Sequence, residues 1–172
     1  GMTPQTGLPQ NNRVGDFDPF ALPLIIARTG KSLDEVLAEM SSRGGLLGIS
    51  GKSGDMRDLE AGAAAGDERC QLALDVYTEE IRRHLGGMLV ALGGVDAIVF
   101  TGGIGENGSI TRAAVCNGLE ELGIVIDSQK NQSLKGETTF HGESSRVQLW
   151  VIPTNEELIV ARQCVELLQN KT

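Results

Sequence analysis

Hydrophobic and polar positions along the chain follow two different periods, and the pattern predicts an α/β fold. Residues 95–101 form an apolar run with β-branched and aromatic side chains, which is typical of a buried strand in a parallel sheet. Residues 146–152 repeat this signal, and residues 124–127 predict a further short strand. Elsewhere, apolar side chains recur at the i, i+3, i+4 and i+7 spacing of amphipathic helices. The segments with this spacing are residues 20–27, 32–43, 68–92, 109–122 and 154–169.

Capping residues support several of these helix boundaries. Ser32-Leu33-Asp34-Glu35 and Thr154-Asn155-Glu156-Glu157 both match the capping box, and Asp67 stands directly before the longest predicted helix. Gly86-Gly87 interrupts that helix. The glycine pair predicts either close packing against another element, such as a second subunit, or a kink.

Three segments rich in glycine, proline or polar residues predict loops: residues 2–18, 50–54 and 128–145. Residues 46–49 are too short to assign. The first loop is a long polar entry, which predicts either a disordered tail or half of a site that is completed elsewhere. We expect its Asp16 and Asp18 to stabilise the loop rather than bind a metal. The short helix after Pro19 is expected to be buried, because it is strongly apolar.

Composition and charge exclude some classes of partner. With 172 residues, of which 40% are hydrophobic and 22% charged, the chain can form a domain with its own core. A net charge of −8 argues against a nucleic-acid partner, which would require clustered Lys and Arg. The apolar runs are shorter than a membrane span and no leader pattern opens the chain, so we expect a cytoplasmic protein with no membrane partner. Gly1 ahead of Met2 is typical of a residue left by tag removal.

Cysteine and histidine positions do not suggest a metal centre. Cys70, Cys116 and Cys164 are widely spaced within predicted helices, so we expect buried, reduced thiols. His84 and His141 lie far from any cysteine and lack ligand spacing, so we expect surface or structural roles for both.

The strand at residues 95–101 runs directly into a glycine-rich loop at residues 102–107, and a helix follows. Glycines lack Cβ atoms and let a backbone approach a ligand closely. The loop also fits G-x-G-x-x-G, and Asp127 ends the next predicted strand 19 residues beyond Gly108, as in a dinucleotide-binding fingerprint. Glu106 argues against this interpretation, because a carboxylate inside the loop would repel a diphosphate. An NAD-binding Rossmann domain and a purely structural glycine turn stay open as alternatives.

Five segments, in order along the chain, resemble the C-terminal half of the acetate kinase family, and the match covers nearly the whole chain. They are Thr3-Pro4 through Gly7-Leu8, Arg13-x-Gly15-Asp16-x-Asp18-Pro19, Gly48 through Leu59, Phe100 through Asn107, and Val151 through Leu158. Asn11-Asn12 and Gly102 depart from the residues that are usual in the family, and neither departure removes a functional group.

The resemblance implies an α/β, ribonuclease-H-like domain of the sugar kinase, heat-shock-protein-70 and actin superfamily, one half of a two-domain kinase. It implies an entry loop over residues 1–18 and a nucleotide-binding C-terminal domain over residues 19–153. Residues 154–172 would form a C-terminal helix that returns to the N-terminal domain.

Members of this family transfer the γ-phosphoryl group between ATP and acetate with the help of Mg²⁺. The resemblance therefore implies that Arg13 stabilises the transferring phosphoryl group and that Glu156 helps to hold Mg²⁺. The nucleotide-binding residues that it implies are Asp55, Met56, Arg57, Gly103, Ile104, Gly105, Glu106 and Asn107. These roles suit phosphoryl transfer, which depends on positioning and electrostatic neutralisation more than on covalent chemistry.

Each charged candidate also has a simpler possible role. Arg13 would then be a solvated surface arginine. Arg57 would then form a salt bridge with Asp58 or Glu60. Glu156 would be an acidic residue that favours a helix start with no further function.

The family's N-terminal strand, its phosphate-binding loop and its catalytic histidine have no counterpart in the chain. The resemblance thus implies half an active site, which binds ATP and ADP but is inactive alone, and which acts on a short-chain carboxylate such as acetate only with an N-terminal half. Acetate, propionate and butyrate all stay open as acceptors. The alternative is a non-catalytic nucleotide-binding or dimer-forming module from a truncated or split gene. An apolar face on the last helix further predicts a homodimer or larger assembly.

Overall fold

A computed structural model describes residues 2–169, with the backbone alone described at Glu156. The expectation for Gly1 lies outside the described residues. By its internal contacts the chain divides into two compact units, Gly1–Gly94 (unit 1) and Val95–Thr172 (unit 2), and each is described by itself.

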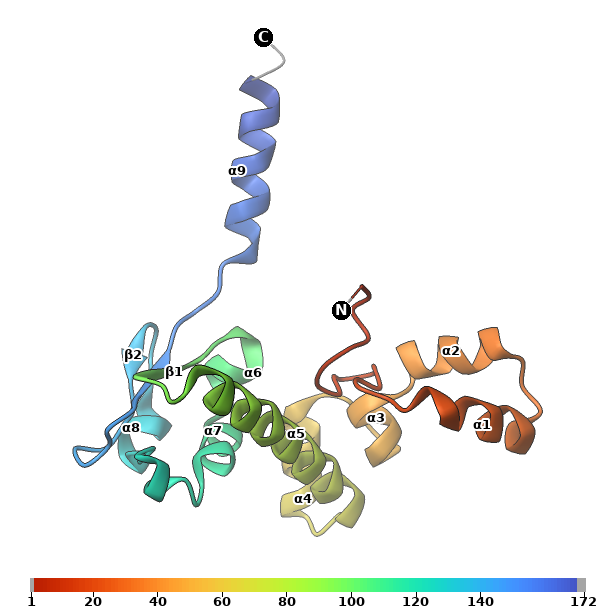
Figure 1. The fold of residues 1–172 in the computed structure, drawn as a ribbon, viewed down its shortest axis with the longest axis horizontal. Coiled ribbons are helices and arrows are strands. Elements are labelled where there is room, and N and C mark those ends of the chain that lie inside the picture. Colours follow the sequence, from red (N-terminus) through yellow and green to blue (C-terminus); the bar gives the residue numbers. More distant parts are fainter. Residues whose placement is uncertain (1, 170–172) are drawn as a thin grey trace. The chain divides into compact units, whose positions relative to one another are not determined.

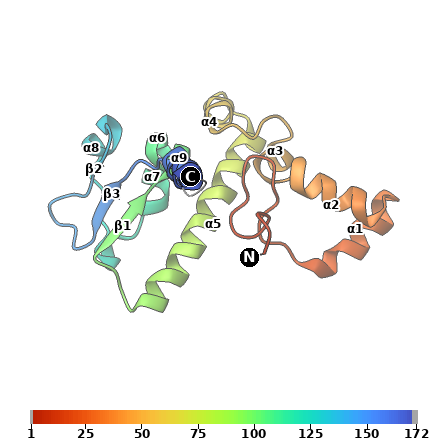
Figure 2. The same ribbon diagram turned by 90° about the horizontal axis from the view of Figure 1, so that it is seen from above.

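All the regular elements of the described part of unit 1 are helices (Figures 1 and 2). Its elements are η1 (Pro19–Ala21), α1 (Leu22–Thr29), α2 (Leu33–Ser42), α3 (Gly45–Ser50), α4 (Met56–Ala64) and α5 (Glu68–Leu92). Helices α3 and α4 pack against α5, and α1 packs against α2. The buried apolar side chains of this unit are Val36, Leu46, Leu59, Cys70, Ala73 and Tyr77.

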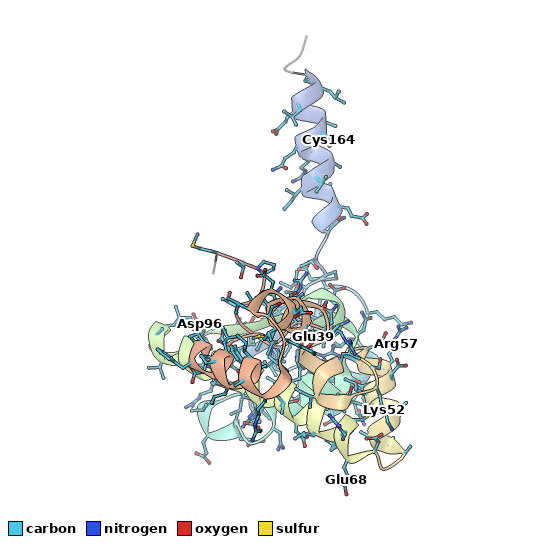
Figure 3. The ribbon with its side chains drawn as sticks, turned by 90° about the vertical axis from the view of Figure 1, so that its right-hand side faces the viewer. Glu39, Lys52, Arg57, Glu68, Asp96 and Cys164 are labelled. Atoms are coloured by element: carbon cyan, nitrogen blue, oxygen red, sulfur yellow. The ribbon has the colours of Figure 1, made fainter. Side chains whose placement is uncertain are left out.

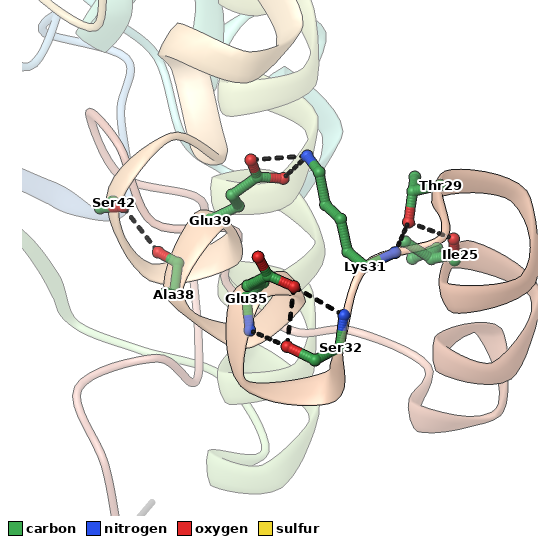
Figure 4. Close-up of polar contacts among 8 residues, drawn as sticks. All are labelled: Ile25, Thr29, Lys31, Ser32, Glu35, Ala38, Glu39 and Ser42. Carbon is green, nitrogen blue, oxygen red and sulfur yellow. Dashed lines mark hydrogen bonds and ion pairs between the residues drawn. The ribbon is translucent and has the colours of Figure 1, made fainter.

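The start of α2 has the predicted capping box, which Figure 4 shows in detail. The Ser32 hydroxyl accepts a hydrogen bond from the Glu35 amide, and the Glu35 carboxylate accepts one from the Ser32 amide. The backbone bond from Ser32 lowers the pKa of Glu35. Lys31, directly before this cap, forms an ion pair at 2.6 Å with Glu39, which lies farther along α2. Helix α1 departs from prediction, because none of its side chains is buried in the described chain.

The long helix α5 has the predicted bounds and the predicted cap. Asp67 accepts hydrogen bonds from the amides of Arg69 and Cys70, and Gly93 ends the helix in the left-handed conformation. The expected interruption at Gly86-Gly87 is wrong, because α5 continues through both glycines. A Cβ atom at either glycine would have no neighbour within 4 Å, so no described element packs closely there.

The entry loop has no helix or strand before η1, as predicted, but it is tied to α3 by its backbone. The carbonyl oxygens of Gln10, Asn11 and Asn12 accept hydrogen bonds from the amides of residues 46, 47 and 44. The entry is therefore an ordered loop that supplies partners for the free amides at the start of α3.

Unit 2 is built on a three-stranded sheet (Figure 2). Its elements are β1 (Ala97–Phe100), α6 (Gly102–Asn107), α7 (Ser109–Cys116), η2 (Glu120–Leu122), α8 (Ser128–Ser133), β2 (Thr138–Thr139), β3 (Gln148–Val151) and α9 (Glu156–Gln169). The strand order is β1-β3-β2, in which β1 and β3 are parallel and β2 is antiparallel to β3. The register pairs Phe100 with Val151 and Val151 with Thr138.

Several boundaries in unit 2 differ from prediction. Helix α7 ends at Cys116, because Gly118 turns the chain in the left-handed region at φ +71°. The strand expected at 124–127 is only an isolated bridge between Ile126 and His141. The segment 128–145, expected to be a loop, contains α8 and β2.

The core of unit 2 is formed by side chains of α7, β3 and the segments between them. Its buried apolar side chains are Val115, Cys116, Ile124, Phe140, Val147, Leu149 and Val151. Cys70 and Cys116 are buried thiols as predicted, but Cys164 is exposed on α9, so its predicted burial is wrong (Figure 3). Within residues 2–169, no helix combines the length and apolar character needed to cross a bilayer.

Candidate nucleotide site

The parallel strands β1 and β3 bring two segments to one edge of the sheet of unit 2. Because β1 and β3 are parallel, α6 and residues 152–155 both leave from their carboxyl ends. The Thr101 hydroxyl donates a hydrogen bond to the Ile152 carbonyl at 2.8 Å, and the Ile152 amide donates one to the Phe100 carbonyl at 3.0 Å. In open α/β sheets, ligands bind in the crevice outside the carboxyl ends of the strands.

The glycine-rich segment is a short helix, α6, and not the predicted loop. Gly102 starts it at φ +70°, a conformation that glycine adopts without strain. A Cβ atom at Gly103 would meet nothing within 4 Å, whereas one at Gly105 would lie 3.2 Å from the Phe100 carbonyl carbon. Gly105 thus serves packing against the strand, while the position of Gly103 leaves open space beside its backbone.

The Glu106 carboxylate faces the segment that follows β3. Its Oε1 accepts a hydrogen bond from the Thr154 amide at 3.0 Å, and the Thr154 hydroxyl approaches the same oxygen at 3.5 Å. Asn107 donates its side-chain amide to the Gly103 carbonyl at 2.9 Å, inside α6. Among the described side chains, Glu106 and Asn107 therefore shape this edge through contacts within unit 2.

The cap of α9 differs from the predicted capping box. Asn155 accepts a hydrogen bond from the Leu158 amide at 3.0 Å, so Asn155 caps the helix, and Thr154 instead bonds Glu106. Glu156 is the first residue of α9 and lies two positions after Thr154. Its expected role in holding Mg²⁺ depends on its side chain and stays a prediction.

A pocket of about 300 Å³ lies at this edge of the sheet. The segment before β2 also reaches it, because β2 runs antiparallel to β3 and begins opposite Val151. The lining residues are Glu106, Asn107, Leu134, Lys135, Gly136, Val151 and Pro153. Two of these are predicted site residues, and Lys135 adds a cation that the sequence did not single out.

Arg112 is a buried residue that sequence analysis missed. Its exposed fraction is 2%, and burial lowers the pKa of its guanidinium. Its Nη1 donates to the Gly105 and Glu106 carbonyls at 2.7 and 2.9 Å. Arginine at the surface of a helix is common, so the sequence carried no signal of this burial.

In unit 1, Arg13 lies in the ordered entry loop. Its backbone carbonyl accepts a hydrogen bond from the Gln10 amide, and the Val14 amide next to it bonds the Met40 carbonyl. The one hydrogen bond found for its guanidinium among residues 2–169 is a long contact of 3.5 Å to the Gln10 side chain. The backbone is therefore held while most of the guanidinium N–H groups stay available to a ligand.

Asp16 and Asp18 have the expected structural roles. Asp16 accepts a hydrogen bond from the Gly7 amide at 2.8 Å, which is the main cause of its lowered pKa, and it also pairs with Arg83. Asp18 accepts one from the Phe20 amide and so caps η1. Across the described part of the chain, no group of three or more His, Cys, Asp or Glu side chains is arranged to hold a metal ion.

Asp55, Met56 and Arg57 form the start of α4. Asp55 caps this helix through the Arg57 amide and also accepts two hydrogen bonds from the Arg57 guanidinium, at 3.0 and 2.6 Å. These bonds lower the pKa of Asp55 to about 2 and raise that of Arg57. The expected alternative partners, Asp58 and Glu60, are wrong, because the partner of Arg57 is Asp55. The Arg57 side chain is 88% exposed and lies at the surface (Figure 3).

The histidines also have structural contacts. His141 Nδ1 lies 3.3 Å from the Leu149 amide, and His84 lies 3.6 Å from the Asp16 carboxylate. The predicted site residues thus form two sets. Residues 103–107 lie in unit 2 beside Thr154, and Arg13 and residues 55–57 lie in unit 1.

This geometry defines an α/β protein that presents a glycine-bearing segment at the carboxyl edge of two parallel strands, where such folds bind ligands. The chain belongs to the acetokinase family, whose sequence profile matches residues 1–162. This assignment removes the Rossmann alternative for the glycine motif.

Individual relatives agree with the family assignment. The chain is 43% identical over 169 residues to an acetate kinase of Heliobacterium modesticaldum, covering 98% of this chain and 42% of that protein. It is 45% identical over 167 residues to a propionate kinase of Escherichia fergusonii, covering 97% of this chain and 41% of that protein. The chain therefore spans less than half the length of these relatives.

The fold agrees as well. The crystal structure of Porphyromonas gingivalis acetate kinase matches with a TM-score of 0.89 and 38% identity, covering 98% of this chain and 42% of that chain. This likeness confirms the expected α/β fold of the sugar kinase, heat-shock-protein-70 and actin superfamily.

Proposed function

We propose that this chain is the ATP-binding half of a short-chain carboxylate kinase of the acetate kinase type, and that it is inactive alone. The observation that carries the proposal is the family match across residues 1–162, which includes every candidate residue. Two further observations support it: the free space beside the Gly103 backbone, and the position of this segment at the carboxyl ends of the parallel strands, where such folds bind ligands. Residues 55–57 and 103–107 would bind the nucleotide.

The available groups suit phosphoryl transfer. Arg13 would stabilise charge on the transferring phosphoryl group, since its guanidinium is nearly without protein partners. Mg²⁺ is usually held by one or two carboxylates together with phosphates and waters, so the single carboxylate of Glu156 fits it without a larger acidic cluster. When bound, Mg²⁺ would neutralise charge on the phosphates. The carboxylate acceptor would be bound with an N-terminal half.

Calorimetric titration of the chain with ATP and Mg²⁺, and separately with NAD, tests the nucleotide assignment. We expect binding of ATP and none of NAD. Arg57→Ala should weaken ATP binding, while Arg28→Ala, which removes another exposed arginine of unit 1, should leave it unchanged. Absence of ATP binding, or equal losses in both variants, would contradict the assignment.

A coupled assay tests the half-site. With ATP, Mg²⁺ and acetate or propionate, we expect no turnover from the chain alone and turnover after an N-terminal half is added. In the mixture, Arg13→Ala should lower kcat by roughly a thousandfold or more, as loss of a phosphoryl-stabilising arginine does. Turnover by the chain alone near about 1–10³ s⁻¹ would refute the half-site proposal.

A second candidate function is a non-catalytic nucleotide-binding module that forms dimers. The observation that favours it is the exposure of apolar side chains along α9: Leu158, Ile159, Val160, Val165, Leu167 and Leu168. Light scattering that detects only monomer at high concentration would argue against association.

A further inference from the structure

The guanidinium of Arg112 forms a buried link between α6 and α8. Toward α6 it donates to the carbonyls of Gly105 and Glu106, at 2.7 and 2.9 Å. Toward α8 its Nε donates to the Asn131 side-chain oxygen at 2.8 Å, and its Nη2 donates to the Asn131 carbonyl at 2.9 Å. Asn131 is itself 3% exposed and donates its amide to the Ser109 carbonyl at 2.8 Å. One side chain thus connects the end of α6 to a separate helix.

The two carbonyls on α6 need such a partner. The last carbonyls of any helix lack partners within the helix. In α6, the Gly108 amide satisfies the Ile104 carbonyl, and the next two carbonyls, of Gly105 and Glu106, are those that Arg112 binds. A buried carbonyl without a partner costs free energy, so the guanidinium fixes the direction of this end of α6.

Packing holds the same end of α6 from the other side. Gly105 lies against the backbone of Phe100, at the end of β1. The Phe100 ring packs edge-on against the Phe140 ring, with centroids 5.6 Å apart, and the Arg112 guanidinium lies 5.5 Å from the centroid of Phe140. The end of α6 is therefore enclosed between the strand and the arginine.

The cost of burying this charge argues for a role beyond general packing. Among residues 2–169, Arg112 forms no ion pair with a carboxylate, and its partners are neutral oxygens and one ring. A buried cation without a counter-ion is expensive, and an apolar side chain of similar size would fill the same space at lower cost. An apolar side chain could not donate the hydrogen bonds that fix the end of α6.

We propose that Arg112, held in place by Asn131, is a positioning residue that fixes the nucleotide-binding segment 103–107 in its binding conformation. This inference rests on the proposed function, since it assigns nucleotide contacts to α6. Arg112 itself is enclosed by protein, so it acts through α6 and not by touching the ligand.

Amide hydrogen exchange and ATP titration of the full chain test the proposal in four variants. Arg112→Met keeps most of the volume and removes every donor, and Arg112→Lys keeps one charged donor group. Asn131→Ala keeps the arginine and removes the side-chain oxygen that accepts from its Nε, so it serves if the Arg112 variants do not fold. Val115→Ala is the control, because it opens a cavity at a fully buried position of α7 and the valine side chain has no polar atom that could bond α6.

We expect faster exchange of the amides of residues 102–107 in Arg112→Met, a smaller increase in Arg112→Lys and Asn131→Ala, and no selective increase in Val115→Ala. ATP affinity should fall about tenfold or more in Arg112→Met, in line with the loss of hydrogen bonds to a charged group, and about twofold or less in the control. Exchange that is unchanged, or that rises equally in the control, would overturn the positioning role. A wild-type chain that does not bind ATP would overturn the proposed function, while the exchange comparison would still decide whether Arg112 orders α6.

Discussion

Substituting Gly103 with alanine should strengthen the fold and weaken nucleotide binding. Gly103 lies within α6 with a backbone conformation that L-residues adopt, and an added Cβ atom would meet no atom within 4 Å. Alanine is favoured over glycine at such a position by about 0.4–1 kcal/mol. For a chain of 172 residues, that gain corresponds to a rise in Tm of roughly 1–4 °C.

The nucleotide should respond in the opposite direction. If ATP lies against the backbone at Gly103, the methyl group occupies the space of the ligand, and a loss of about 1.4 kcal/mol would weaken binding tenfold. Calorimetric titration gives the affinity, and thermal unfolding gives Tm. Gly108→Ala is the matched control, since its Cβ would lie 2.6 Å from the Ile104 carbonyl oxygen and should lower stability by about 1–3 kcal/mol.

Two results would refute this reasoning. A Gly103→Ala chain of higher Tm with unchanged ATP affinity would show that the open space does not receive the ligand. A chain of lower Tm would show that the position needs glycine for the fold, as Gly108 does.

Three further predictions concern stability. Gly62→Ala should lower the free energy of unfolding by about 1–3 kcal/mol, because its Cβ would lie 2.6 Å from the Cys70 Sγ. Cys70→Ala should recover part of this loss in urea unfolding, and strictly additive losses would contradict the contact. The hydrogen bond from Lys52 and those from the start of α5 lower the pKa of Asp67 from 3.8 to about 2, so its stabilisation is complete above pH 3.8 and is lost as the pH falls toward 2. Asp67→Asn should therefore flatten the acid-unfolding curve in that window, and an unchanged slope would refute the assignment. Leu149→Ala should lower the unfolding free energy of unit 2 by about 2–5 kcal/mol, since this β3 side chain is fully buried, and a loss under about 1 kcal/mol would be inconsistent with its burial.

Local signals in the sequence predicted the main elements well. The bounds of α5 and its Asp67 cap follow from a strong period and a capping residue, and both are confirmed. The strands β1 and β3 follow from runs of β-branched and aromatic residues. Asp127 shows where local interpretation failed. The apolar run before it predicts that Asp127 ends a strand, but its carboxylate caps α8 by accepting hydrogen bonds from the amides of Gln129 and Lys130.

Elements that depend on distant partners were beyond prediction. Strand β2 has two residues, and its pairing with β3 is what makes it a strand. In the site, the glycine motif was visible, but the bond between Glu106 and Thr154 joins residues 48 positions apart. The buried link through Arg112 spans 19 positions to Asn131. Contacts between residues so far apart along the chain leave no periodic pattern in the sequence. The sequence therefore indicated residues of the site but not the contacts that position them.

The order of strands in unit 2 has a consequence for synthesis and folding. Among the described residues, the central strand β3 is also the last strand, and it pairs with β1 about fifty residues before it. Pairing of this kind closes a long loop and is slow compared with local helix formation. During translation, β1 and α6 must wait for β3 before the sheet can form. Mutations that slow this pairing should therefore reduce the yield of folded protein more than they reduce its equilibrium stability.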